Sequence, residues 1–91
     1  MNTDILMFEG EKIDLKLIKE RHKKYDMFPT PWGKMTLWYL TYRIDYLTEQ
    51  TQVSPMVEVR PYLYKIIDTM KAIKAYLEEE KYHHEPIYNR V

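Results

Sequence analysis

Hydrophobic positions in the middle of the chain repeat with the period of an α-helix, most clearly over residues 32–50. At 100° per residue, one side of this segment collects aliphatic residues with 3-4-3 spacing: Leu37, Leu40, Ile44 and Leu47. The opposite side collects large and mostly aromatic residues: Met35, Trp38, Tyr39, Tyr42 and Tyr46. A helix that is apolar on two opposite sides is expected to be covered on both.

Residues that cap or break helices predict the ends of this central helix. The segment 28–31 contains two prolines, which remove backbone donors and restrict the residues before them. Thr30 is the predicted N-cap and Pro31 the first helical residue. The helix is expected to end near Gln50, before a connection through residues 51–55.

A second long helix is predicted from about Arg60 to about Tyr82, with Pro61 in its first turn. Its aliphatic stripe has the spacing of the stripe on the central helix: Leu63, Ile66, Ile67, Met70, Ile73 and Leu77. The matching stripes predict an antiparallel helix pair with heptad-like packing.

A shorter helix is predicted from an N-cap at Asp14 to about Asp26. The expected buried edge has 3-4-3 spacing, with Leu17 beside it: Leu15, Ile18, His22 and Tyr25. Together the three segments predict a mainly α, three-helix bundle-like fold, with residues 1–91 forming a single domain.

Two short apolar segments leave alternatives open. Residues 5–8 are compatible with a strand or with an apolar arm laid across the helices, within an N-terminal arm of residues 1–13. Residues 56–60 alternate like a strand and could pair with residues 5–8 in a two-stranded ribbon, or they could belong to a helix. Residues 83–91 are expected to form an extended tail.

Composition limits the class of protein. The chain is 45% hydrophobic and carries 14 basic and 14 acidic residues, so no net charge favours nucleic acid or an anionic membrane. It has no cysteine, which excludes disulfides and thiolate chemistry. No apolar run approaches the ~18 residues of a membrane span, and no signal peptide is recognisable. We therefore expect a cytoplasmic protein that does not insert into membranes.

The aromatic side of the central helix is the first candidate for a binding surface. The second long helix can cover the aliphatic side, but the short helix and the N-terminal arm can cover the aromatic side only in part. Exposed apolar patches mark interaction surfaces, and Trp, Tyr, Met and Arg are enriched at them. The predicted partner-binding residues are Met35, Trp38, Tyr39, Tyr42, Arg43 and Tyr46, with Asp45 at the rim. The competing interpretation is that this side is ordinary core.

A basic run in the short helix is a candidate nucleic-acid site: Lys16, Lys19, Arg21, Lys23 and Lys24. Asp14, Glu20 and Asp26 interrupt it, and Lys16–Glu20 and Glu20–Lys24 have the spacing of ordinary helical ion pairs. A solvated helix face is therefore the simpler interpretation.

Catalytic, metal and cofactor sites are not predicted. Adjacent His83 and His84 on an extended tail point in opposite directions, and the consecutive residues 78–80 point about 100° apart on a helix. Glu78 is better explained by ion pairing with Lys74 or Lys81. The sequence thus favours a non-catalytic module, such as an inhibitor, adaptor or regulatory subunit, that binds a protein partner or forms a homodimer. A nucleic-acid-binding protein is the alternative.

Overall fold

The computed structural model describes residues 4–53 and 57–84, with side-chain surroundings up to residue 78. Its helices are α1 (Leu15–Tyr25), α2 (Leu37–Val53), the short 3-10 helix η1 (Val57–Val59) and α3 (Arg60–His84). The strands of the described residues form two separate hairpins: β1 (Ile5–Phe8) with β2 (Glu11–Asp14), and β3 (Phe28–Thr30) with β4 (Gly33–Met35). The prediction of a mainly α fold is confirmed.

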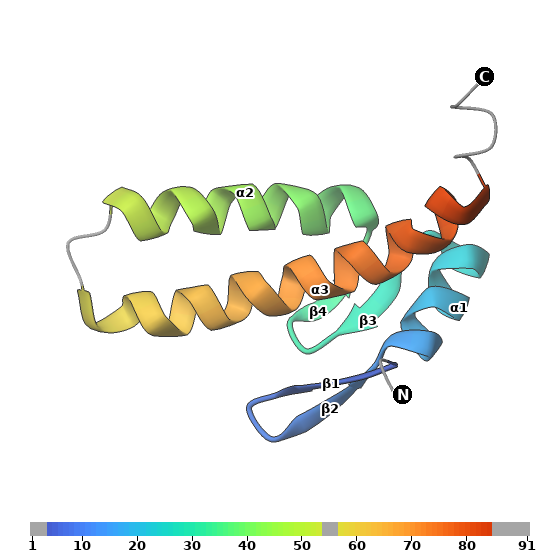
Figure 1. Ribbon diagram of the computed structural model, residues 1–91, viewed down its shortest axis with the longest axis horizontal. Coiled ribbons are helices and arrows are strands. Elements are labelled where there is room, and N and C mark those ends of the chain that lie inside the picture. Colours follow the sequence, from blue (N-terminus) through green and yellow to red (C-terminus); the bar gives the residue numbers. More distant parts are fainter. Residues whose placement is uncertain (1–3, 54–56, 85–91) are drawn as a thin grey trace.

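The long helices α2 and α3 lie side by side and run in opposite directions (Figure 1). Their contact is the most extensive between any two helices of the described chain. α1 packs against α3 and against β3. In the view of Figure 1, α1 and both hairpins lie below α3, whereas α2 lies above it.

The aliphatic stripes of the two long helices form the centre of the core. Leu40 and Ile73 have no solvent exposure. The other buried members of the stripes are Ile44, Leu47, Ile67, Met70 and Leu77, with Leu37, Leu63 and Ile66 partly buried at the margin. The predicted stripes are therefore confirmed as core.

Both long helices extend beyond their predicted C-terminal ends. α2 continues past Gln50 to Val53, and Thr51 is buried at the next position of the stripe. The Thr51 hydroxyl donates a hydrogen bond to the Thr48 carbonyl oxygen at 2.6 Å, which satisfies it inside the core. α3 continues through His84, so the prediction of an extended tail is wrong for residues 83 and 84. Its remainder, residues 85–91, lies outside the described residues.

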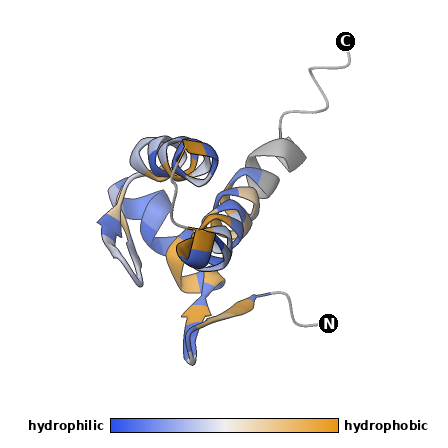
Figure 2. Cartoon of the chain, turned by 90° about the vertical axis from the view of Figure 1, so that its left-hand side faces the viewer, coloured by the Kyte–Doolittle hydropathy of each residue, from blue (hydrophilic) through white to orange (hydrophobic). Residues whose placement is uncertain are grey.

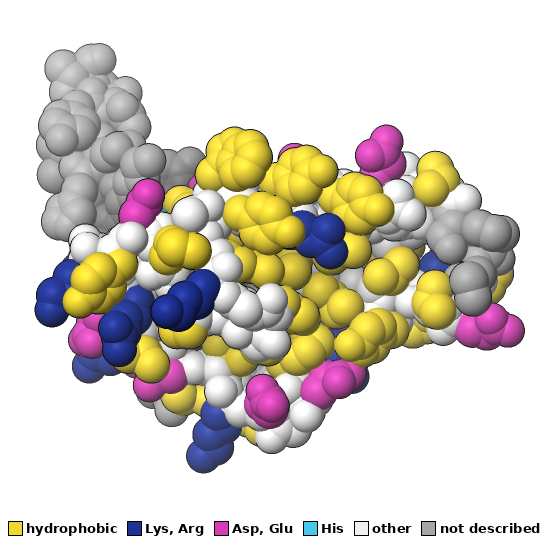
Figure 3. Space-filling model, turned by 180° about the vertical axis from the view of Figure 1, so that it is seen from behind, with side chains coloured by type: hydrophobic (Ala, Val, Ile, Leu, Met, Phe, Trp, Pro, Cys, Tyr) yellow, Lys and Arg dark blue, Asp and Glu magenta, His cyan; other side chains and the backbone are white. Residues whose placement is uncertain are grey.

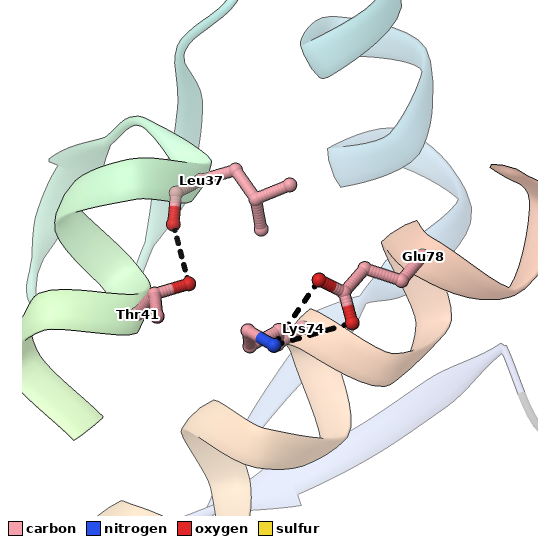
Figure 4. Close-up of polar contacts among 4 residues, drawn as sticks. All are labelled: Leu37, Thr41, Lys74 and Glu78. Carbon is pink, nitrogen blue, oxygen red and sulfur yellow. Dashed lines mark hydrogen bonds and ion pairs between the residues drawn. The ribbon is translucent and has the colours of Figure 1, made fainter. Parts of the chain in front are cut away.

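Polar side chains at the margin of the α2–α3 contact are satisfied within their own helices (Figure 4). The Thr41 hydroxyl donates to the Leu37 carbonyl oxygen at 3.0 Å. The Lys74 ammonium lies 3.1 Å from the Glu78 carboxylate, so this predicted ion pair is confirmed. Neither contact takes a polar atom into the core unpaired.

The boundaries of α1 follow from its caps. The Asp14 carboxylate accepts a hydrogen bond from the Leu17 amide at 3.1 Å, as predicted for an N-cap. Asp26 ends the helix in the left-handed region at φ 65°, and its amide donates to the His22 carbonyl oxygen at 3.2 Å.

The predicted buried edge of α1 is only partly correct. Leu15 and Ile18 are buried, and the half-buried His22 packs edge-on against Phe28 with ring centroids 5.5 Å apart. Tyr25 is 57% exposed, contrary to expectation, and Leu17 beside this edge is exposed as well. Strand β3 packs against α1 through Phe28, which contacts His22. A strand of three residues is too short to cover the whole length of the helix.

The N-terminal hairpin replaces the predicted ribbon between residues 5–8 and 56–60. β1 pairs with β2 around Glu9 and Gly10, which both have positive φ. Two adjacent positive φ values suit a tight hairpin turn, and pairing across it closes a far shorter loop than the predicted ribbon would. Residues 57–59 form a 3-10 helix instead, and residue 56 lies outside the described residues. The apolar strand β1 is orange in Figure 2.

The second hairpin replaces the predicted first turn of the central helix. Phe28 pairs with Met35 across β3 and β4, and both side chains are buried. Gly33 lies between them at φ 110°, outside the helical region. The N-cap of α2 is therefore Thr36, whose hydroxyl oxygen accepts from the Tyr39 amide at 3.0 Å, and not Thr30.

Candidate interaction surface

Three aromatic side chains of α2 form a row along the helix. Trp38, Tyr42 and Tyr46 follow one another at four-residue intervals, which places them on one side of an α-helix. The ring centroids of Trp38 and Tyr42 are 5.9 Å apart with planes at 5°, and those of Tyr42 and Tyr46 are 6.4 Å apart at 21°. The Tyr39 ring lies 6.1 Å from the Tyr42 ring. These four residues are called the aromatic face below.

The aromatic face is open to solvent. Trp38 is 73% exposed, and the three tyrosines are 40–50% exposed. Figure 3 shows hydrophobic side chains in a row along α2, at the upper edge of that view. Neither α1 nor the N-terminal hairpin covers this row. Transfer of such large aromatic side chains from water into an apolar contact lowers the free energy.

The position of this face follows from the periodicity of α2. At 100° per residue, Tyr42 lies about 160° around the helix from Leu40, which is fully buried. α3 packs on the aliphatic side, so no other element of the described chain is left to cover the aromatic side. The described elements of the chain therefore leave these rings exposed, and burying them requires a further surface.

Charged residues flank the aromatic face on both sides. The Arg43 guanidinium lies 5.1 Å from the centroid of the Tyr46 ring, a cation–π contact that fixes the cation beside the row. Asp45 is exposed, and the helical period places it on the other side of the row. The face therefore has a cationic edge and an acidic edge.

Met35 does not belong to this face, contrary to the sequence-based expectation. It lies in β4 and is buried to 4% exposure, because α2 begins only at Leu37. Val53 instead extends the row at the C-terminal end, seven residues after Tyr46, and it is exposed. The helical spacing could have identified Val53 if the end of α2 had been predicted three residues later.

The basic residues of α1 differ in their surroundings. The Lys19 ammonium lies 4.4 Å above the Tyr76 ring of α3. The Tyr76 hydroxyl donates to the Asp4 carboxylate at 2.6 Å, so Lys19 is part of the contact between α1, α3 and the N-terminal segment. Arg21 and Lys24 both lie near the Tyr25 ring, 5.9 and 5.8 Å from its centroid. Lys16 and Lys23 are exposed.

Within the described residues, no three histidine or carboxylate side chains lie close enough together to hold a metal ion. His22 packs against Phe28, and the side chains of His83 and His84 lie outside the described part of the chain. None of the described helices is both long enough and apolar enough to span a bilayer.

Comparison with known proteins gives no relative: no protein-family model, curated protein or solved structure matches this chain. We therefore infer function from the residues of the chain and their geometry.

Proposed function

We propose that the chain is a small protein-interaction module without catalytic activity, built on a three-helix bundle-like framework. It acts by burying its aromatic face against a protein surface, and the first such surface is that of a second copy of the chain. Trp38, Tyr42 and Tyr46 are the anchors, and Arg43 and Asp45 lie at the rim. A role as an inhibitor, adaptor or regulatory subunit in the cytoplasm fits such a module.

The exposure of four adjacent aromatic side chains supports this proposal most directly. Stacking already restricts the rings, so less conformational entropy is lost when a partner binds. Buried Trp and Tyr side chains dominate the binding energy of many interfaces. A symmetric dimer uses the same surface on both subunits, so the aromatic face of one copy can bury that of a second copy.

The proposal is tested by the mass in solution. Sedimentation equilibrium of the native chain should give a concentration-dependent mass that rises from 11.2 kDa towards twice that value. The variant Trp38→Ala/Tyr42→Ala should remain monomeric, because each lost anchor weakens association by about 2 kcal/mol, roughly 30-fold. Tyr62→Ala/Tyr64→Ala removes two exposed aromatics of α3 and is the matched control, which should associate like the native chain. A native chain that stays monomeric at every concentration would contradict self-association.

Nucleic acid is the competing ligand, because Arg21 and Lys24 beside the exposed Tyr25 offer charge and a ring for stacking. This alternative predicts retention on heparin that weakens steeply with salt. An absence of retention at low salt would contradict the nucleic-acid alternative. Lys19 is held by Tyr76, which leaves fewer cations for phosphates.

A further inference from the structure

A second apolar surface lies where α1 meets the hairpin of β3 and β4. It is a groove of about 480 Å³, and its lining residues come from both elements: Leu17, Arg21, Tyr25, Met27, Phe28, Pro29 and Lys34. None of them belongs to the aromatic face. The volume lies within the range of about 300–1,000 Å³ that is usual for ligand sites.

Apolar side chains form most of this groove. Phe28 is buried, whereas Leu17, Tyr25 and Met27 are each 43–57% exposed. The half-exposed lining means that the groove is open along the surface and is not an enclosed cavity. An extended segment with a large apolar side chain can therefore lie in it without any rearrangement of the fold.

Two cations at the groove have no acidic counterpart. Arg21 comes from α1 and Lys34 from β4, and both side chains are exposed. Among the described residues neither forms an ion pair, and no carboxylate lines the groove. The Arg21 guanidinium lies 5.9 Å from the Tyr25 ring centroid, a contact with the ring face that leaves its N–H groups available to an acceptor. Glu20 and Asp26, the acidic residues within the sequence range of the lining, are not themselves lining residues, and Asp26 is the C-cap of α1.

We propose that this groove binds a peptide segment of a partner protein in which a large apolar side chain is flanked by carboxylates. The apolar residue would pack on Leu17, Met27 and Phe28. The carboxylates would pair with Arg21 and Lys34, and guanidinium groups hold carboxylates through paired N–H donors. A nucleic acid fits less well, because it brings phosphates but no aliphatic group for the leucine, methionine and proline of the lining.

The proposal is tested by fluorescence anisotropy with a fluorescein-labelled probe peptide, Glu-Asp-Phe-Glu-Leu-Asp. A matched peptide in which Gln and Asn replace the acids is the neutral control. The full chain is used throughout. The acidic peptide should bind, and its affinity should fall as salt is raised, because rim ion pairs are screened. The neutral peptide should bind roughly tenfold more weakly.

Charge reversal places the peptide in the groove. Arg21→Glu/Lys34→Glu should weaken binding of the acidic peptide at least roughly tenfold. Lys16→Glu/Lys65→Glu reverses two other exposed lysines and should bind like the native chain. Circular dichroism checks that both variants are folded. Equal binding by the two variants, or equal binding of the two peptides, would overturn the proposal. Free N-acetylphenylalanine that binds as tightly as the peptide would overturn its assignment to a protein segment.

Discussion

Trp38 and Leu40, two residues apart on α2, differ completely in their surroundings. Trp38 is 73% exposed and Leu40 is 0% exposed, because the helical period turns them to different sides. Leu40 packs in the α2–α3 core, and the stacked neighbour of Trp38 is Tyr42 on the same helix. The larger side chain should therefore matter less for folding than the smaller one.

The free energy of unfolding tests this difference. Leu40→Ala should lower it by about 2–5 kcal/mol, because it leaves a cavity in the core. Trp38→Ala should change it by less than about 0.5 kcal/mol, as is usual for exposed positions. Urea denaturation at protein concentrations where the monomer dominates measures both changes. A cost for Trp38→Ala as large as that for Leu40→Ala would mean that the aromatic face is core.

Residues that act through near neighbours in sequence could be predicted. Asp14 caps α1 and Lys74 pairs with Glu78, and both contacts span three or four residues. Tyr25 could not be placed in the same way. Its spacing matches that of Leu15 and Ile18, but its burial depends on whether β3 reaches over it, which no local pattern encodes.

At the scale of elements, the two edges of the aromatic face restrict how two α2 helices can pair. In a parallel pair the edge with Arg43 meets the partner's edge with Asp45, so that opposite charges face each other. In an antiparallel pair each edge meets its own copy, so that like charges face each other. We therefore expect the α2 helices of a dimer to run parallel.

Charge swaps test this arrangement. Arg43→Glu and Asp45→Arg should each weaken association several-fold, since exposed ion pairs contribute about 0.2–1 kcal/mol and like charges cost similar amounts. The variant that carries both swaps should recover part of the loss, because opposite charges face each other again. Dimer dissociation constants from sedimentation measure the coupling. Losses that simply add in the double variant would contradict the parallel arrangement.

The hairpins are the elements that sequence reasoning did not find. Thr30 and Pro31 have the features of a helix start, yet Phe28 and Met35 are buried as a cross-strand pair. A strand of three residues is too short to show an alternating pattern, so the pairing depends on contacts with the core. The long stripes of α2 and α3 could be predicted because they repeat over several turns.

At the scale of the whole molecule, the two candidate surfaces are separate. The aromatic face lies on α2, and the groove lies between α1 and the β3–β4 hairpin. Figure 3 shows the hydrophobic row along α2 and basic side chains gathered at one end of the same view. The aromatic face could be predicted from one helix alone. The groove could not, because Lys34 of β4 approaches α1 only through the fold of the hairpin.

The quenching of Trp38 fluorescence tests the burial of the aromatic face most directly. The other tryptophan, Trp32, is partly buried, and its ring centroid lies 5.1 Å from that of Phe8. The substitution Trp32→Phe therefore leaves Trp38 as the single fluorescent tryptophan. In that variant, acrylamide should quench Trp38 strongly in dilute solution and progressively less as protein concentration rises. The emission should shift to shorter wavelength over the same range. Strong quenching and unchanged emission at every concentration would contradict burial of the aromatic face by a second copy of the chain.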